Sequence, residues 1–201
     1  SENGRVIFHR AIKRAKLLAF FETLPPCLVG MEACGSSHHW GRQLRKLGHD
    51  VRLMPAGYVK PYVKRGKSDA ADAAAICEAI GRPTMRFVAI KSAEQQALLS
   101  LHRSRELMVR QRTQTVNTLR GLLAEFGHVV ARNIERACAL ARDIVKGDGP
   151  ELPELAQAAI GVLCQQLLEL NDKVRWFTRK IAAAARADDR GRLLQTIPGV
   201  G

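Results

Sequence analysis

The first half of the chain alternates short apolar runs with longer stretches of mixed polarity. Asn3-Gly4 is a hairpin-type turn, and the apolar runs that follow it are typical of strands. The mixed stretches have apolar residues three and four apart, which favours amphipathic helices. In chain order we expect a strand, a helix, a strand, a helix and a strand, at residues 5–11, 13–24, 27–33, 37–47 and 49–54. This β-α-β-α-β alternation predicts a parallel sheet covered by helices.

The second half has a helical pattern throughout. We expect three helices and one break, at residues 92–126, 131–145 and 154–186 and at residues 147–150. The last helix carries an uninterrupted apolar series, whereas Arg105 and Arg112 interrupt the series of the first. These patterns predict an antiparallel helical hairpin or coiled coil, and a compact bundle within one chain is the alternative. Because the apolar stripe from Leu163 to Ile181 is costly to leave in water, we also expect this region to join at least two copies of the chain.

The charge balance narrows the class of partner. The 201 residues include 32 Lys and Arg against 19 Asp and Glu, which gives a net charge of +13 and a pI of about 10.1. Such an excess indicates a polyanion, most simply nucleic acid. The five cysteines include no CxxC pair, which argues against a zinc site or a disulfide framework. No signal peptide and no apolar run of about eighteen residues is visible, so we expect a cytoplasmic bacterial protein with no membrane partner.

One short segment, KRGKSDAAD at residues 64–72, carries the clearest candidate chemistry. Ser68 is a good N-cap, and the alanines after it favour helix. Asp69 and Asp72 then stand at positions i and i+3, so they share one helix face. Two like charges this close are commonly offset by a divalent metal ion. The alternative is a solvated acidic first turn that the helix dipole favours.

A third carboxylate, Glu32, ends the apolar run of residues 27–33. The carboxyl end of a strand is where open α/β sheets place their sites. The segments GMEACGS, VRLMPAGYVKPYVKRGKSDAADAAAICEA and IPGVG occur here in this order. Together they resemble the DEDD transposases of bacterial insertion sequences, the IS-110 and IS-1111 group, and the resemblance runs over essentially the whole chain.

The resemblance implies a RuvC-like, RNase H-like domain in which four carboxylates bind two Mg²⁺ ions at a DNA phosphate. Glu32 matches the family's Glu, Asp69 its third acid and Asp72 its fourth, so these three are the expected catalytic and Mg²⁺-binding residues. The family's first acid would precede the Asn3-Gly4 turn, and its nucleophilic Ser would follow the PGVG segment. Neither is matched, so we expect a fragment shortened at both ends, with little or no recombinase activity by itself.

The same resemblance implies a fold of α/β plus all-α class in three parts. These are a RuvC-like domain without its first strand, a helical coiled-coil region and the start of a domain with a helix-hairpin-helix, at residues 1–90, 91–186 and 187–201. The partners it implies are DNA, a guide RNA encoded by the element, and further copies of the chain in a dimer or tetramer.

Positive charge gathers beside the acids and along the first long helix. Residues 58–67 read as a Pro-broken basic loop that includes Tyr58 and Tyr62, and we interpret it as a rim that grips phosphate. The residues expected to contact nucleic acid are Lys60, Lys64, Arg65, Lys67, Arg103 and Arg110. A solvated helix face is an equally good interpretation of the helical arginines, which are Arg103, Arg105, Arg110, Arg112 and Arg120.

Three functions fit these features. A DEDD-type transposase, which is a DNA recombinase, is the leading hypothesis. A Holliday-junction resolvase-like nuclease shares the fold and the metal chemistry, and a downstream catalytic Ser would distinguish the transposase from it. A non-catalytic helical protein that binds nucleic acid needs only the positive charge, and metal binding at the three acids would exclude it.

Overall fold

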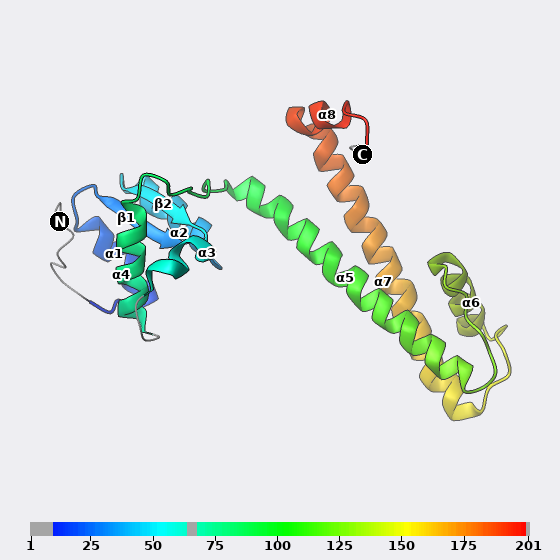
Figure 1. The fold of residues 1–201 in the computed structure, drawn as a ribbon. Helices are drawn as coiled ribbons and strands as arrows, with labels where there is room; N and C mark the ends of the chain where they lie inside the picture. Colours follow the sequence, from blue (N-terminus) through cyan, green and yellow to red (C-terminus); the bar gives the residue numbers. More distant parts are fainter. Residues whose placement is uncertain (1–9, 64–67, 200–201) are drawn as a thin grey trace. The chain divides into compact units, whose positions relative to one another are not determined.

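The computed structural model describes residues 10–63 and 68–199, and it divides into two compact units between Gln96 and Ala97 (Figure 1). The first unit is a small α/β structure. Its elements in chain order are η1 (Arg14–Lys16), α1 (Leu17–Glu22), β1 (Leu28–Glu32), α2 (Ser37–Lys46), β2 (Asp50–Met54), α3 (Ala56–Val59), η2 (Lys60–Tyr62) and α4 (Asp69–Ile80).

The sheet of the first unit consists of β1 and β2, which pair in parallel from Leu28 opposite Asp50 to Glu32 opposite Met54. Met54 is fully buried among residues of α4, so α4 covers the face on which Met54 lies. The side chains of Val51 and Leu53 lie on the opposite face of the sheet from Met54, and they are also fully buried. The crossover helix α2 packs on β2 at that face. The predicted parallel, helix-covered sheet is therefore confirmed for its second and third strands.

Two predictions for this unit are not confirmed. The strand expected at residues 5–11 lies almost wholly outside the described residues, and Arg10 and Ala11 are not in a strand. The basic loop expected from residue 58 is wrong in its first part, because α3 and η2 occupy residues 56–62. Pro55 and Pro61 stand where helices begin, and proline fits a first helical turn, so these prolines do not prevent helix there. The connector at residues 86–90 makes a single antiparallel bridge, Val88 to Leu53.

The second unit is helical. Its elements are α5 (Ala93–Ala124), which begins just before the division, α6 (Ile134–Lys146), α7 (Glu154–Ala187) and α8 (Asp189–Gln195). Asn133 caps α6 by accepting hydrogen bonds from the backbone of Glu135 and Arg136, at 2.7 and 3.3 Å. Gly147 ends α6 at φ 89°, a left-handed conformation that glycine adopts without strain. The predicted helices and the break after residue 146 are confirmed to within a few residues.

In the second unit α5, α6 and α7 lie side by side (Figure 1), and one apolar core joins them. Its buried members are Val116, Leu119, Leu123, Ala137, Cys138, Ala141, Ile144, Ile160, Cys164 and Leu167. The stripe on α7 is therefore filled within one chain over most of its length, and Leu170 and Val174 are buried too. Most of the stripe thus has a partner within the chain, and assembly of two or more copies stays a prediction. The compact bundle is the alternative that the structure supports, and a coiled coil is not confirmed.

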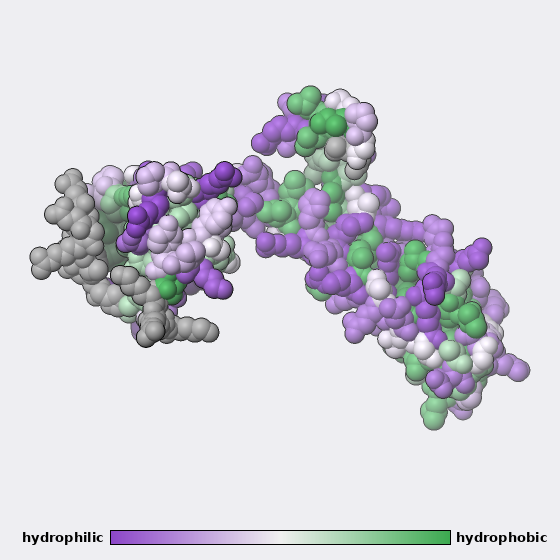
Figure 2. Space-filling model, viewed as in Figure 1, coloured by the Kyte–Doolittle hydropathy of each residue, from purple (hydrophilic) through white to green (hydrophobic). Residues whose placement is uncertain are grey.

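The end of the second unit exposes apolar side chains. Leu193, Leu194 and Ile197 are each about half exposed or more, and Figure 2 shows hydrophobic surface over α8 beside hydrophilic surface. Gly199 has φ 84°, but residues 200–201 lie outside the described part of the chain, so the helix-hairpin-helix stays a prediction. No described helix is both long enough and apolar enough to span a bilayer.

Candidate functional site

Glu32 is held at the carboxyl end of β1 by backbone hydrogen bonds. The N–H of the next residue, Ala33, donates to the carbonyl of Met54 at 2.8 Å, which extends the hydrogen bonding between β1 and β2 one residue past Glu32. The Cys34 N–H donates to the Glu32 carbonyl at 2.9 Å, so the chain turns sharply after the carboxylate. Ser36 adopts φ 68° in this turn before α2 begins. Glu32 is half-buried and ends a strand, as the sequence predicted.

The side chain of Glu32 lies on the sheet face that α4 covers. A Cβ atom added to Gly30 would be only 2.9 Å from Ile76 Cγ2 and 2.9 Å from Ile80 Cδ1, so α4 packs directly on Gly30. Residues two apart in a strand share a face, and Glu32 is therefore on the same side as Gly30 and α4. The missing side chain at position 30 is what lets the helix come this close to the strand that carries Glu32.

Asp69 and Asp72 open α4. Ser68 has extended backbone, and its Oγ accepts a hydrogen bond from the Ala71 N–H at 3.2 Å, which confirms the predicted N-cap. The Asp72 N–H donates to the Ser68 carbonyl at 3.1 Å and forms the first helical bond. Both carboxylates are exposed, and their spacing places them on one side of the first turn. The unpaired N–H groups of that turn favour negative charge there.

The structure does not group the three acids into a ready metal site. Among residues 10–63 and 68–199, no three carboxylate, histidine or cysteine side chains lie closely enough together to hold a metal ion. Carboxylate oxygens are the ligands that Mg²⁺ prefers, so the donor types of Glu32, Asp69 and Asp72 fit this ion. Convergence of the three carboxylates around a metal stays a prediction.

The basic segment beside the acids is only partly described. Lys60 is exposed in η2, whereas Lys64, Arg65 and Lys67 lie outside the described residues. Tyr62 packs against the core below α4, and the Arg82 guanidinium lies 5.7 Å from its ring centroid. Tyr62 is therefore a packing residue rather than an open ring for a nucleic-acid base. Tyr58, which is 48% exposed, stays available.

The arginines of α5 fall into two groups. Three have partners within the second unit: Arg105 donates to Thr178 Oγ1 at 2.8 Å, Arg112 to Asn171 Oδ1 at 2.8 Å, and Arg120 to the carbonyls of Ala131 and Arg132 at 2.9 and 2.8 Å. These three hold the bundle together. Arg103 and Arg110 are exposed, and Arg110 makes only a surface ion pair with Glu106. Of the arginines on α5, these two can contact nucleic acid without breaking a hydrogen bond to another helix or to the segment before α6.

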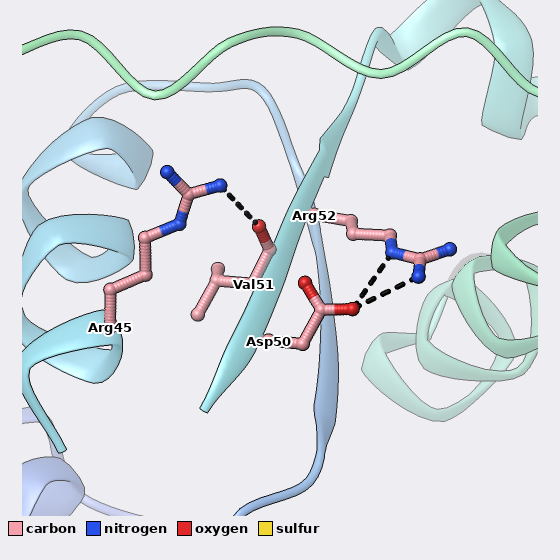
Figure 3. Close-up of polar contacts among 4 residues, drawn as sticks. All are labelled: Arg45, Asp50, Val51 and Arg52. Atoms are coloured by element: carbon pink, nitrogen blue, oxygen red, sulfur yellow. Dashed lines mark hydrogen bonds and ion pairs between the residues drawn. The ribbon is translucent and has the colours of Figure 1, made fainter. Parts of the chain in front are cut away.

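Two further arginines, Arg45 and Arg52, make hydrogen bonds to residues of β2 (Figure 3). Arg45 donates from Nη2 to the Val51 carbonyl at 3.3 Å, on the edge of β2 away from β1. Arg52 donates from Nε and Nη2 to Asp50 Oδ2 at 3.1 and 2.9 Å. The guanidinium of Arg52 also lies 5.2 Å from the Phe87 ring centroid. Because these side chains secure an exposed strand edge and the connector after α4, we give them structural roles.

Known proteins share this sequence over nearly its full length. The family model of IS110-type DEDD transposases, described as Transposase, matches residues 1–128. A Pseudomonas aeruginosa protein named "Probable family 20 transposase" is 47% identical over 197 residues, which cover 98% of this chain and 58% of that protein. A Sinorhizobium fredii protein whose name includes the word transposase is 46% identical over 195 residues, or 97% of this chain and 50% of that one. The transposase for insertion sequence element IS1111A of Coxiella burnetii is 36% identical over 200 residues, or 100% of this chain and 55% of that one.

These relatives bear on the three functions that the sequence left open. All are named as transposases, and none is named as a junction resolvase or a non-catalytic binding protein. The chain spans about half to three-fifths of the length of each relative. No solved structure matches it. On the matched residues and these identities, the chain belongs to the DEDD transposase family of IS110-type insertion sequences.

Proposed function

We propose that this chain supplies the acid-bearing half of an insertion-sequence transposase that recombines DNA by acting on its phosphodiester bonds. The observation that supports this most is the placement of Glu32 on the sheet face covered by α4, the helix that Asp69 and Asp72 open. Three carboxylates on two elements that pack together are of the donor type that metal-assisted phosphoryl transfer uses, and the family resemblance implies a fourth. The RuvC-like assignment of residues 1–90 and the helix-hairpin-helix at residues 187–201 belong to this proposal.

Mg²⁺ is the proposed cofactor, with Glu32, Asp69 and Asp72 as its ligands. When bound, Mg²⁺ would polarise the scissile phosphate and stabilise the negative charge that develops there. The three side chains would position the phosphate through their ions, and Asp69 and Asp72 are exposed enough to reach a large substrate. Glu32, half-buried on its strand, would fix the position of the site.

The nucleic-acid contacts in this proposal come from lysine and arginine side chains. Those closest in sequence to the acids are Lys60, Lys64, Arg65 and Lys67, and those on α5 are Arg103 and Arg110. The net charge of +13 supports binding of a polyanion. A guide RNA rests on the family resemblance. Assembly into a dimer or tetramer rests on it too, because the apolar stripe of α7 packs within one chain over most of its length. A bacterial cytoplasmic location is also part of this proposal.

The experiment is transposition of a marked element in a bacterial cell. A chimera would carry this chain in place of the matching residues of the Pseudomonas aeruginosa relative. We expect Glu32→Gln, Asp69→Asn and Asp72→Asn each to lower transposition by about 100-fold or more, because removing a ligand weakens metal binding and misplaces the ion. Glu78→Gln, an exposed carboxylate on the same helix α4, is the matched control and should keep transposition. Full activity in the three acid variants, with normal protein levels, would reject the proposal.

A further inference from the structure

The outward face of α7 carries a tryptophan that the core does not explain. Val174 and Leu167 are buried at 5% and 0% exposure, whereas Trp176 is 45% exposed. Trp176 follows Val174 by two positions, which turns it about 200° away around the helix, so it lies opposite the core. Its ring meets Phe177 edge to face at a centroid distance of 4.9 Å, and Lys180 Nζ lies 5.6 Å from its centroid. A large aromatic ring is thus kept in solvent beside a cation.

Positive charge surrounds this ring. From residue 172 to 186, α7 has five basic residues and one acidic residue: Lys173, Arg175, Arg179, Lys180 and Arg186 against Asp172. Asp172 stands four positions before Trp176 and adds one negative charge to its face. Lys173, Arg179 and Lys180 stand three or four positions from Trp176, so they share this face too. All three are exposed. The Lys173 ammonium contacts Glu169 at 3.5 Å, a surface pair that contributes little free energy and opens readily.

The side chains on this face indicate which kind of ligand it can bind. Lysine and arginine bind phosphates, and the π-face of tryptophan stacks on unpaired bases of any sequence. Paired bases inside a duplex are stacked on one another and cannot reach such a ring. A second copy of the chain is a poor fit, because a two-fold contact would bring the same cations face to face. Toward the start of α7 the same face continues through polar Gln165 and Glu169, so it forms no continuous apolar seam.

We propose that the face of α7 formed by Lys173, Trp176, Arg179 and Lys180 binds single-stranded nucleic acid. Trp176 stacks on one base, and the three cations contact the phosphates on either side of it. The cation–π contact of Lys180 is weak at an exposed site, so the ammonium can move from the ring to a phosphate as the base arrives. The inference rests on the proposed function for its setting, in which separated strands or an RNA are present, but it needs none of the three acids.

The test is a titration of the full chain with single-stranded oligonucleotides of about 16 nucleotides, DNA and RNA, followed by tryptophan fluorescence and by anisotropy of a labelled strand. Trp40→Phe leaves Trp176 as the only tryptophan, and we expect its emission to be quenched on binding. Trp176→Ala should weaken binding about 5- to 100-fold, and Trp176→Phe should retain most of the affinity because the ring persists.

A charge-matched control separates a local site from net charge. The triple variant Lys173→Ala, Arg179→Ala, Lys180→Ala should weaken binding clearly more than a triple variant on α6. That control is Arg136→Ala, Arg142→Ala, Lys146→Ala, which removes the same charge from exposed helical positions. Equal losses in the two triples, or unchanged affinity in Trp176→Ala, would overturn the proposal.

Two further measurements distinguish the remaining outcomes. If Trp176→Ala lowers the mass measured by light scattering and leaves strand affinity unchanged, the face joins copies of the chain and the proposal is wrong. Asp69→Asn and Asp72→Asn should leave single-strand affinity unchanged while abolishing transposition in the chimera. Failure of the α7 site and failure of the proposed metal site are therefore separate results.

Discussion

Arg112 on α5 donates a hydrogen bond from Nη1 to Asn171 Oδ1 on α7, at 2.8 Å, across the helical bundle. Arg105 makes the equivalent bond to Thr178, seven residues earlier on α5 and seven later on α7. The two bonds therefore fix an antiparallel register between the helices. The arginines that interrupt the apolar series of α5 are matched by polar partners on α7, and Asn171 is only 6% exposed.

Removing the Arg112 guanidinium should destabilise the bundle. Arg112→Ala leaves the nearly buried amide of Asn171 without its donor, and we expect a loss of about 1–3 kcal/mol in the free energy of unfolding. Chemical denaturation followed by circular dichroism measures this. The matched control is Arg110→Ala, two residues away. The ion pair of Arg110 with Glu106 is exposed, so its loss should lower the free energy of unfolding by no more than about 0.5 kcal/mol.

The double variant Arg112→Leu, Asn171→Leu extends this test. Replacing both partners by apolar groups removes the desolvation cost of each, so it should recover much of the stability lost by Arg112→Ala. If Arg112→Ala is no more costly than Arg110→Ala, the bond between Arg112 and Asn171 does not secure the register.

These residues also show which features of the helical bundle could be predicted from the sequence. Apolar spacing places the helices of the bundle well, because burial requires one face of each helix to be apolar. From apolar spacing alone, Arg105 and Arg112 only interrupt the apolar series of α5. The pattern of one helix cannot reveal the polar side chains on α7 that these arginines contact. The pattern also did not reveal that α6 supplies much of the apolar surface that packs against the α7 stripe.

The candidate site was predictable in part. Ser68, Asp69 and Asp72 follow local capping rules, and the position of Glu32 follows from a strand that ends in a Gly-Ser turn. That Gly30 admits α4 to this face was not predictable, because it depends on contacts between distant residues. The packing of Tyr62 against the core below α4 was not predictable either, because its basic neighbours in the sequence do not show which ring lies beneath a helix.

Adding a side chain at Gly30 should separate α4 from β1. The new Cβ atom of Gly30→Ala would press on Ile76 and Ile80 at 2.9 Å, and overpacking of this kind costs about 1–3 kcal/mol. Gly57→Ala is the control: its Cβ atom would meet nothing within 4 Å, and alanine favours helix, so stability should stay equal or rise slightly. Thermal unfolding of both variants measures the difference. Equal melting temperatures would mean that α4 does not pack closely on position 30.

Stability should fall at alkaline pH through a buried thiol. Burial raises the pKa of Cys164 from 9.0 to about 11, and burial also raises the pKa of Cys138. The unfolded chain then releases its thiol protons first, so the free energy of unfolding should decrease as the pH rises from about 9 to about 11. For Cys164 alone this amounts to about 2 kcal/mol. Denaturation at several pH values should show a smaller decrease in Cys164→Ala, and an identical decrease would contradict the assignment.

Binding to duplex DNA should depend strongly on salt concentration because of the basic residues that precede Asp69 in the sequence. Lys64→Ala, Arg65→Ala and Lys67→Ala together should flatten the slope of log affinity against log salt by about 2–3, since each phosphate contact contributes about 0.9. Fluorescence anisotropy at several salt concentrations measures the slope. The α6 triple variant provides the same loss of charge at another place. If both triples change the slope equally, the segment at residues 64–67 is merely solvated.

The proposed metal site can be tested directly by calorimetric titration of the full chain with Mn²⁺, which accepts the same oxygen ligands as Mg²⁺. We predict weak binding that Glu32→Ala, Asp69→Ala and Asp72→Ala each remove and that Glu78→Gln leaves intact, because the three carboxylates would share one site. Binding that survives all three substitutions, or that Glu78→Gln weakens as much as they do, would contradict the proposed metal site.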